Sequence, residues 1–419
     1  MENRERTAGK VGYRDILRQR EYLKIILAGL INRFGDSIDA IAFTWLVYAI
    51  TGNAAWSALV FAANQLPSVL VQPFAGALVE GMDKKRLMVL TDAVRGVTTS
   101  GLAVLYLTGH VNPWILLAFT LINSTVEAFR LPAALAVTPL VLEEKYYAYG
   151  TSFSSTMNTV VQLIGMGLAG VIIGAFGIGS AIVIDGVSFF GSALILRFLR
   201  LRERSLKRGN LRVREYAASL KGGFCYLRQQ PAIRNFCLLS VMVNAFITPL
   251  NSLQSPLIQE VMGQGSTLLS AFALAMTAGM GIGSFVYPSV SKTISVRAQF
   301  SVMGIVMGAG MCAYTLGGRI RSNVAAVYIL TIVVSFAIGA SCSILVSALS
   351  VQFMRTVSQE YLARVGAIFN AGASAATPAA SLAVSALAAF CSVSQIFLFS
   401  GAICVIIFMF IRLRKVRLE

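Results

Sequence analysis

The chain has 419 residues, of which 56% are hydrophobic and 13% are charged, and its mean hydropathy is +0.73. Soluble domains carry about 25% charged residues, so this composition excludes an ordinary soluble protein and indicates a membrane protein. The net charge of +17 would suggest nucleic-acid binding in a soluble chain. Here the cations gather in short segments between apolar blocks, so we expect no nucleic-acid partner.

Apolar stretches of membrane length follow one another along nearly the whole chain. They predict an all-α membrane protein with twelve transmembrane helices, at 24–48, 55–80, 86–107, 113–140, 152–176, 178–199, 233–258, 266–290, 298–317, 325–350, 364–389 and 393–412. One long hydrophilic segment divides the first six from the last six. We therefore predict an N-terminal half with its arm at 1–199, a linker at 200–232 and a C-terminal half with its tail at 233–419.

The distribution of positive charge predicts the orientation of these helices. With the N-terminus inside, the segments that face the cytoplasm hold 30 of the 35 lysines and arginines, and only Arg319 and Arg321 lie in an outside loop. Positive charge accumulates in cytoplasmic loops of membrane proteins. The sequence therefore predicts a multi-pass protein of the cell membrane (inner or plasma) with both termini in the cytoplasm.

The first predicted helix carries charges where a bilayer makes them costly. Its stretch "INRFGDSIDAIAF" (31–43) contains Arg33, Asp36 and Asp39 at helical spacing, on one face. At about 1.5 Å per residue, the two aspartates lie roughly 18 and 22 Å from the start of the helix. This depth is near the middle of a hydrocarbon core about 30 Å thick, where ionisable residues usually serve function.

Further charges follow in the first half, and the predicted helices of the second half have none at matching positions. Asp92 and Arg95 lie one helical turn apart, as do Glu127 and Arg130, and Asp185 lies in the sixth predicted helix. These charges can stabilise helices as local pairs, namely Asp36 with Arg33, Asp92 with Arg95 and Glu127 with Arg130. For Asp92, Arg95 and Asp185 we favour this structural role.

Three acids and one arginine near mid-membrane cannot all neutralise one another, which favours a functional role. Burial favours the neutral form of a carboxyl group and a nearby arginine favours its charged form, so such a group can bind and release a proton. The predicted proton-coupling residues are Asp36, Asp39, Arg33 and Glu127. The predicted substrate cavity is lined by Asn32 and Phe43 and, from the second half, by Asn244, Phe246, Asn251 and Asn370.

Metal, cofactor and catalytic motifs are not evident. The six cysteines show no metal-binding spacing, so we expect neither a metal site nor disulfides. The stretch "GMGLAG" (165–170) matches a dinucleotide-binding pattern, but it lies inside an apolar helix, where small residues serve close helix packing. A membrane-embedded enzyme is the alternative class. The chain lacks the nucleophile, metal cluster or haem ligands for one, so no enzyme activity is predicted.

Motifs along the whole chain resemble those of the major facilitator superfamily, and within it the macrolide-efflux-like drug exporters. They are "NRFGDSI", "WLVYAITGNA", "GALVEGMDKKRLMVLTDAVRG" (76–96), "FRLPAALAVTPLV" and "IDGVSFF", in this order. The resemblance implies two pseudo-symmetric six-helix halves. In the 76–96 stretch it implies a cytoplasmic gate made of Gly76, Glu80, Lys84 and Lys85, with Arg130 as a candidate partner. The alternative is that Glu80 and the lysines only anchor the loop. Met166 stands where antiporters of the superfamily often have proline.

Together these features predict a secondary transporter, an antiporter that exports amphipathic or hydrophobic small molecules of the drug or macrolide type by alternating access. The proton gradient would be its energy source, with no cofactor. A transporter of lipids, lysophospholipids or siderophore-type metabolites is the alternative. The expected partners are a small amphipathic substrate and membrane lipids, and the expected state is a monomer.

Overall fold

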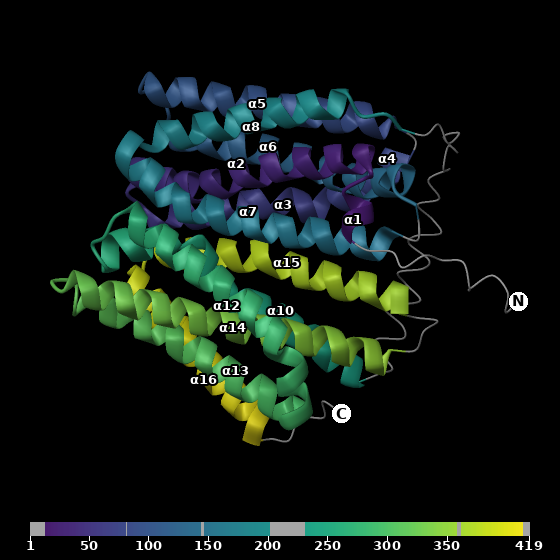
Figure 1. Cartoon of the computed structure of the whole chain (residues 1–419). Helices are drawn as coiled ribbons and strands as arrows, with labels where there is room; N and C mark the ends of the chain where they lie inside the picture. Colours follow the sequence, from purple (N-terminus) through teal and green to yellow (C-terminus); the bar gives the residue numbers. More distant parts are fainter. Residues whose placement is uncertain (1–12, 81, 144–145, 202–230, 358–361, 414–419) are drawn as a thin grey trace, which may run out of the picture.

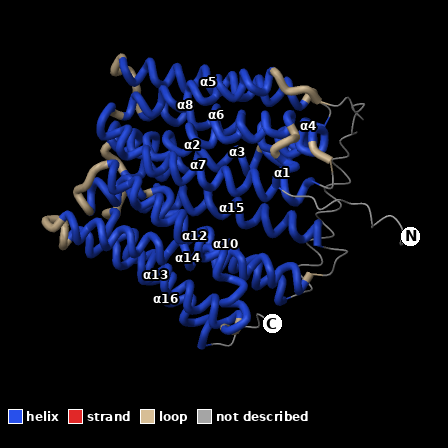
Figure 2. Tube along the Cα trace, in the orientation of Figure 1, coloured by secondary structure: helices blue, strands red, loops and turns tan. Residues whose placement is uncertain are grey.

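The computed structural model describes residues 13–80, 82–143, 146–201, 231–357 and 362–413. These residues form helices without any strand, as Figure 2 shows. The helices of the first half are α1 (Tyr13–Ile16), α2 (Arg20–Thr51), α3 (Ala54–Leu70), α4 (Gln72–Glu80), α5 (Lys84–Leu107), α6 (Pro113–Val141), α7 (Tyr147–Phe176) and α8 (Ile178–Arg197). Those of the second half are α10 (Pro231–Ser252), α11 (Gln254–Pro256), the π-helix η2 (Leu257–Val261), α12 (Ser266–Thr293), α13 (Val296–Tyr314), the short 3₁₀ helix η3 (Thr315–Gly318), α14 (Val324–Thr356), α15 (Leu362–Ala388) and α16 (Val393–Leu413).

Several helices start at a side chain that satisfies a free backbone N–H group. Asn53, Asp83, Asn112 and Asn323 each accept a hydrogen bond from a backbone N–H two or three residues further on, at 2.8 to 3.1 Å. Gly52, with φ of 58°, ends α2 and turns the chain into α3. Only glycine adopts this left-handed conformation readily, so the turn between the first two long helices is fixed by sequence.

Ten helices of the described part are long and apolar enough to cross a membrane. The two predicted helices outside this set are 24–48 and 55–80. The first forms α2, which contains the three charges. The second is broken at Val71 into α3 and α4, because Pro73 lacks the N–H group that would continue the helix. The all-helical membrane fold is confirmed. Of the twelve predicted membrane helices, ten are long and apolar enough in the described structure to cross a membrane. The predicted linker falls almost entirely within 202–230, outside the described residues.

The helices α2–α8 lie together, as do α10–α16, and α2 begins at the same edge of the bundle at which α16 ends (Figure 1). We call this edge, where α2 begins and α16 ends, the terminal end, and the opposite edge the loop end. Many apolar side chains of the outer helices are exposed, such as Phe285 (87%) and Phe399 (56%). Such a surface belongs in lipid.

Among the described residues, the buried core that the two groups of helices share lies at the loop end. There, residues such as Ile41 and Ile173 pack with Leu253 and Phe272 in one buried cluster. At the terminal end, the described buried clusters each belong to a single group, one around Leu87 and Val137 and the other around Ile233 and Phe353. The bundle is therefore closed at the loop end and less tightly joined at the terminal end.

Direct hydrogen bonds reinforce the contact at the loop end. The Oγ atoms of Ser381 and Ser385 in α15 donate to the backbone oxygens of Ala58 (2.6 Å) and Ala55 (2.8 Å) in α3. The hydroxyl of Tyr48 in α2 donates to Glu260 of η2 at 3.2 Å. These bonds join elements far apart in sequence, so they hold the two groups of helices together directly.

Candidate functional site

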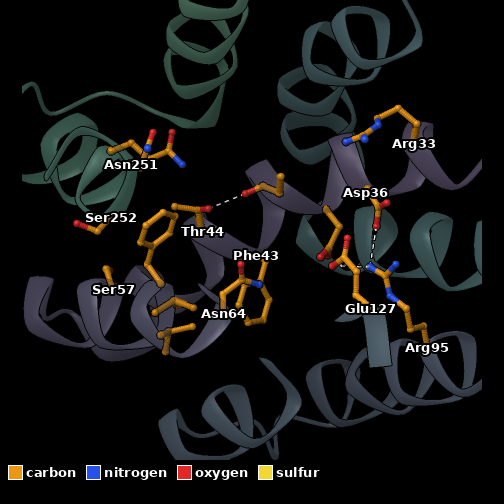
Figure 3. A pocket seen from close by; sticks show the side chains of 16 residues that line it. Arg33, Asp36, Phe43, Thr44, Ser57, Asn64, Arg95, Glu127, Asn251 and Ser252 are labelled. Atoms are coloured by element: carbon orange, nitrogen blue, oxygen red, sulfur yellow. Dashed lines mark hydrogen bonds and ion pairs between the residues drawn. The ribbon is translucent and has the colours of Figure 1, made fainter. Parts of the chain in front are cut away.

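A cavity of about 400 Å³ lies between the two groups of helices (Figure 3). Its lining comes from α2, α3, α5 and α6 on one side and from α10 and α11 on the other. The lining residues are Arg33, Asp36, Asp39, Ala40, Phe43, Thr44, Val47, Ser57, Val60, Phe61, Asn64, Arg95, Glu127, Asn251, Ser252 and Gln254. The cavity thus combines several charges with aromatic, aliphatic and amide side chains. Its volume lies within the range of small-molecule sites, about 300 to 1,000 Å³.

One face of α2 forms the charged wall of this cavity. Arg33, Asp36, Ala40, Phe43 and Val47 recur at intervals of three and four residues, and all of them line it. The other side of α2 packs closely on α8. A Cβ atom added at Gly35 would lie 2.1 Å from the Ser188 hydroxyl. Glycine at this position therefore lets α2 approach α8 while its charged face meets the cavity.

Arg95 of α5 is the centre of the charge cluster. Its Nη2 atom donates to Oδ1 of Asp36 at 2.9 Å and lies 3.9 Å from Oε2 of Glu127. Its guanidinium also lies over the ring of Phe189 at 4.1 Å, a cation–π contact. Arg95 is 8% exposed. A single buried cation thus joins acids from α2 and α6.

A second buried network surrounds Asp92, which is fully buried. The guanidinium of Arg130 binds its carboxylate through Nε and, at 3.3 Å, through Nη2. Ser192 donates to Asp92 at 2.6 Å and Asn32 at 3.2 Å. Together these four residues connect α2, α5, α6 and α8, which makes the network a structural junction of the first half.

The predicted pairs within single helices are therefore wrong. Asp92 is paired with Arg130, and Arg95 with Asp36 and Glu127. The reason is burial: a carboxylate without water needs several donors, and neighbouring helices supply more of them than one turn of its own helix. Figure 3 shows the Asp36 carboxylate directed at Arg95 and not at Arg33.

Some charged atoms of the cluster lack partners. Oδ1 of Asp39, Oδ1 of Asp185 and Nε of Arg95 are buried without a hydrogen bond in the described structure. Arg33 is exposed on the cavity wall, and no ion pair with a described residue is recorded for it. Among the described residues, the cluster thus contains more carboxyl groups than cations that bind them.

The other predicted cavity residues are placed differently. Phe43 and Asn251 line the cavity, and Phe43 contacts Phe119 with ring centroids 5.5 Å apart. Asn32 is buried behind the cavity at Asp92, and Phe246 packs near Phe408, at 6.5 Å. Asn244 lines a neighbouring pocket of about 260 Å³ together with Gln65, Ser68, Ala373, Ser374 and Thr377. The side chain of Asn370 lies outside the described residues.

The structure describes only part of the surroundings of the predicted gate residues. Lys84 and Lys85 begin α5 at the terminal end, and Lys85 lines a basic pocket there. Arg130 binds Asp92. Gly76 and Glu80 lie in α4, but their side-chain surroundings fall outside the described part of the chain. Whether Glu80 acts as a gate or an anchor stays a prediction.

Sequence reasoning missed several cavity residues of α3. Ser57 and Asn64 line the cavity, and Asn64, Gln65, Ser68 and Gln72 line a connected pocket beside Glu127. Ser57, Asn64 and Ser68 recur at intervals of seven and four along the otherwise apolar α3, and Gln72 at the start of α4 continues the interval of four. This periodicity is a detectable sequence signal for a polar face. The described residues contain no group of His, Cys, Asp and Glu that could hold a metal ion.

Comparisons with known proteins agree with this architecture. The model of the Major Facilitator Superfamily matches residues 25–330. The multidrug efflux pump Tap of Mycolicibacterium fortuitum is 23% identical over 69% of this chain and 72% of its own length. Macrolide efflux protein A of Streptococcus pyogenes is 23% identical over 85% of this chain and 86% of its own. The crystal structure of the nucleoside transporter NupG superposes with a TM-score of 0.76 at 11% identity, covering 94% of this chain and 99% of that one.

Proposed function

Because the chain belongs to the major facilitator superfamily of membrane transporters, we propose that it is a proton-coupled antiporter that exports amphipathic or hydrophobic small molecules. The observation that carries this proposal is the cavity between the two groups of helices. Asp36, Asp39 and Glu127 line it, and Asp36 and Glu127 share Arg95. The efflux pumps among its relatives support export as the direction.

The proposed orientation places the terminal end in the cytoplasm, in a cell membrane, following the distribution of positive charge. The closed loop end then faces outward, and the less tightly joined terminal end faces the cytoplasm. In this state a monomer would receive its substrate from the inner side. Rocking of the two halves about the cavity would then open the loop end.

The proton would act through the ion pairs of Arg95. When Asp36 is ionised it accepts a hydrogen bond from Arg95 at 2.9 Å, which ties α2 to α5. Protonation of Asp36 weakens this attraction and frees Arg95 for Glu127, whose carboxylate is 3.9 Å away. Proton binding therefore changes how α2, α5 and α6 are held, without a cofactor.

The cavity lining supports an amphipathic substrate. Phe43, Phe61 and Val60 offer apolar contact, whereas Asn64 and Asn251 offer amide groups from the two halves. A compound with an apolar body and a few polar groups would be complementary to this surface. The unpaired Arg33 at the wall adds a cation for an acidic or strongly polar group.

Transport into proteoliposomes with an imposed pH gradient tests the proposal. The panel comprises ethidium as a cation, erythromycin as a macrolide and a lysophospholipid as the lipid alternative. We expect gradient-dependent accumulation of ethidium or erythromycin by the unmodified protein. The Asp36→Asn variant should still bind the substrate but lose accumulation, because its amide cannot titrate.

Three results would count against the proposal. Accumulation unaffected by the pH gradient would exclude proton coupling. Transport of the lysophospholipid alone would favour the lipid alternative. Accumulation by Asp36→Asn at the level of the unmodified protein would exclude Asp36 as the proton carrier and make Glu127 the next candidate.

A further inference from the structure

A basic pocket lies at the terminal end of the first half, away from the central cavity. It has a volume of about 580 Å³ and is lined by Arg20, Glu21, Lys24, Lys85, Arg197, Phe198, Leu199 and Arg200. These residues come from the start of α2, the start of α5 and the end of α8, which pack against one another. The pocket is thus formed by tertiary structure and not by one basic segment.

The charges of this pocket are unbalanced. Its lining contains five cationic residues and one acid, Glu21. Lys24 donates to Glu21 at 2.7 Å and to the backbone oxygen of Phe198 at 3.0 Å, and the backbone N–H of Arg200 donates to Glu21 at 2.7 Å. Burial raises the pKa of Glu21, but these donors outweigh it and hold this pKa below its ordinary value. Glu21 is therefore an ionised, satisfied wall residue, and the excess of cations remains.

An apolar surface runs from this pocket along the outer face of α5 and α8. Its exposed side chains include Leu90 (61%) and Val97 (62%) of α5, Val187 (63%) and Leu194 (59%) of α8, and Phe198 (65%) at the pocket itself. In a membrane this surface contacts acyl chains, and the pocket lies where the headgroups begin. The cationic pocket and the apolar surface are therefore placed so that one phospholipid could contact the pocket with its headgroup and the surface with its acyl chains.

We propose that this pocket binds the phosphate headgroup of an anionic phospholipid, with the acyl chains along α5 and α8. Arg20, Lys85 and Arg197 supply the charge, since Lys24 is already engaged by Glu21. Basic pockets between transmembrane helices bind anionic headgroups in this manner, and arginine matches phosphate oxygens in a bidentate way. Phosphatidylcholine, which carries no net charge, should bind less well.

Native mass spectrometry of the full-length protein tests the proposal, after incubation with phosphatidylglycerol or phosphatidylcholine. The test variant is Arg20→Gln/Lys85→Gln/Arg197→Gln. The matched control Arg234→Gln/Lys292→Gln/Arg412→Gln removes the same charge from the terminal end of the second half. We expect the unmodified protein and the control to retain phosphatidylglycerol in preference to phosphatidylcholine. The test variant should retain roughly tenfold less of it, because each cation contributes to headgroup binding.

A competition arm with inorganic phosphate distinguishes a lipid from a free anion. Phosphate at the lipid concentration should leave the retained phosphatidylglycerol unchanged, since it lacks the acyl contacts. Displacement by phosphate would mean that the pocket takes a free anion, which would overturn the proposal. Equal losses in the test and control variants would overturn it too, because they would show a general charge effect. None of these measurements depends on transport.

Asp185 of α8 is buried in the first half, with 3% of its surface exposed. Its Oδ1 atom has no hydrogen-bond partner in the described structure. A Cβ atom added at Gly35 would lie 2.6 Å from this oxygen, so the carboxyl group faces α2 at its point of closest approach. The Ser188 hydroxyl, one turn away, donates to the backbone oxygen of Asp185 and also interacts with its carboxyl group.

The charges around Asp185 come from the helices packed on α8. Asp36 and Asp39 of α2 and Arg95 of α5 interact with it electrostatically, and α7 contributes no Asp, Glu, Lys or Arg. Arg95 already binds Asp36 and lies near Glu127, and Asp92 is satisfied by Arg130. Arg33 is exposed on the cavity wall, so no buried cation of the described cluster is left for Asp39 and Asp185. An ionised carboxylate that has a nearby hydroxyl but no cation of its own is unfavourable in such a place.

We infer that Asp185 binds a proton in this state and is a second proton-carrying residue of the cycle. This inference deepens the proposed antiport and rests on it. Release of the proton would require Arg95 to turn from Asp36 toward α8, which links the protonation of Asp185 to the ion pair of Asp36.

Infrared spectroscopy of the purified protein detects protonated carboxyl groups directly. We expect such a signal at neutral pH that Asp185→Asn removes and that the neighbouring variant Ser188→Ala retains. Asp185→Glu, which keeps a titratable group, should shift its frequency, and this variant decides the question if Asp185→Asn does not fold. An unchanged signal in these Asp185 variants would overturn the inference. Because the signal does not depend on transport, its presence alongside failed pH-driven accumulation would contradict the proposed function alone.

Discussion

The two halves of the bundle differ in the buried polar contacts inside each of them. In the described structure, the buried charged side chains Asp92, Arg95 and Asp185 all belong to the first half. The buried polar residues of the second half are neutral, mostly serine and threonine. Ion pairs respond to protonation and neutral contacts do not. Under the proposed antiport, we therefore expect proton-dependent movement to arise in the first half.

The second half relies on close packing at glycine. A Cβ atom added at Gly279 or Gly283 in α12 would lie 2.2 or 2.5 Å from a backbone oxygen of α14, and one added at Gly339 in α14 would lie 2.1 Å from the Met276 oxygen. Such backbone-to-backbone contact allows little rearrangement. In the proposed transport cycle, we therefore expect the second half to act as a rigid surface against which the first half moves.

The largest expected effect comes from removing the Asp92 network. Asp92→Ala leaves Arg130, Asn32 and Ser192 without their shared acceptor, and we expect a loss of about 3 to 5 kcal/mol in stability. Thermal unfolding in detergent measures it. The double variant Asp92→Leu/Arg130→Met removes both charges and should recover most of this loss. Equal destabilisation in the single and double variants would show that the loss of stability does not come from breaking the ion pair.

Glycine packing in the second half should produce the next largest effect. Gly339→Ala forces α14 away from Met276, and we expect a loss of about 1 to 3 kcal/mol. Gly281→Ala is the matched control, since nothing lies within 4 Å of its added Cβ atom. It should be neutral or slightly stabilising. The idea of a rigid second half fails if both variants unfold at the same temperature.

Hydrogen bonds at the loop end should have the smallest effect. Ser381→Ala removes the bond to Ala58 that joins the halves, worth about 1 kcal/mol, or roughly fivefold in the population of the closed state. Ser350→Ala, which loses a bond only to its own helix, is the control. Spin labels at positions 110 and 322 report the separation at the loop end. An unchanged distance distribution in Ser381→Ala would show that this bond does not hold the loop end closed.

Sequence reasoning predicted the membrane helices and the charged face of α2, because both follow from periodicity along the chain. It did not predict which helices meet. The spacing of Asp92 and Arg95 suggested a pair within α5, whereas the structure brings Arg130 and Asp36 to them from α6 and α2. Such contacts depend on tertiary packing, which spacing within one helix does not encode. The break at Val71 could have been predicted from Pro73.

The central claim is that protonation of the first-half cluster controls which end of the bundle is open. Electron paramagnetic resonance tests it most directly, with one spin-label pair at positions 86 and 292 of the terminal end and another at 110 and 322 of the loop end. Between acidic and alkaline pH, we predict opposite changes in the two distances for the unmodified protein and none for Asp36→Asn/Asp185→Asn. Distances independent of pH in the unmodified protein, or an unchanged pH response in this double variant, would contradict the account.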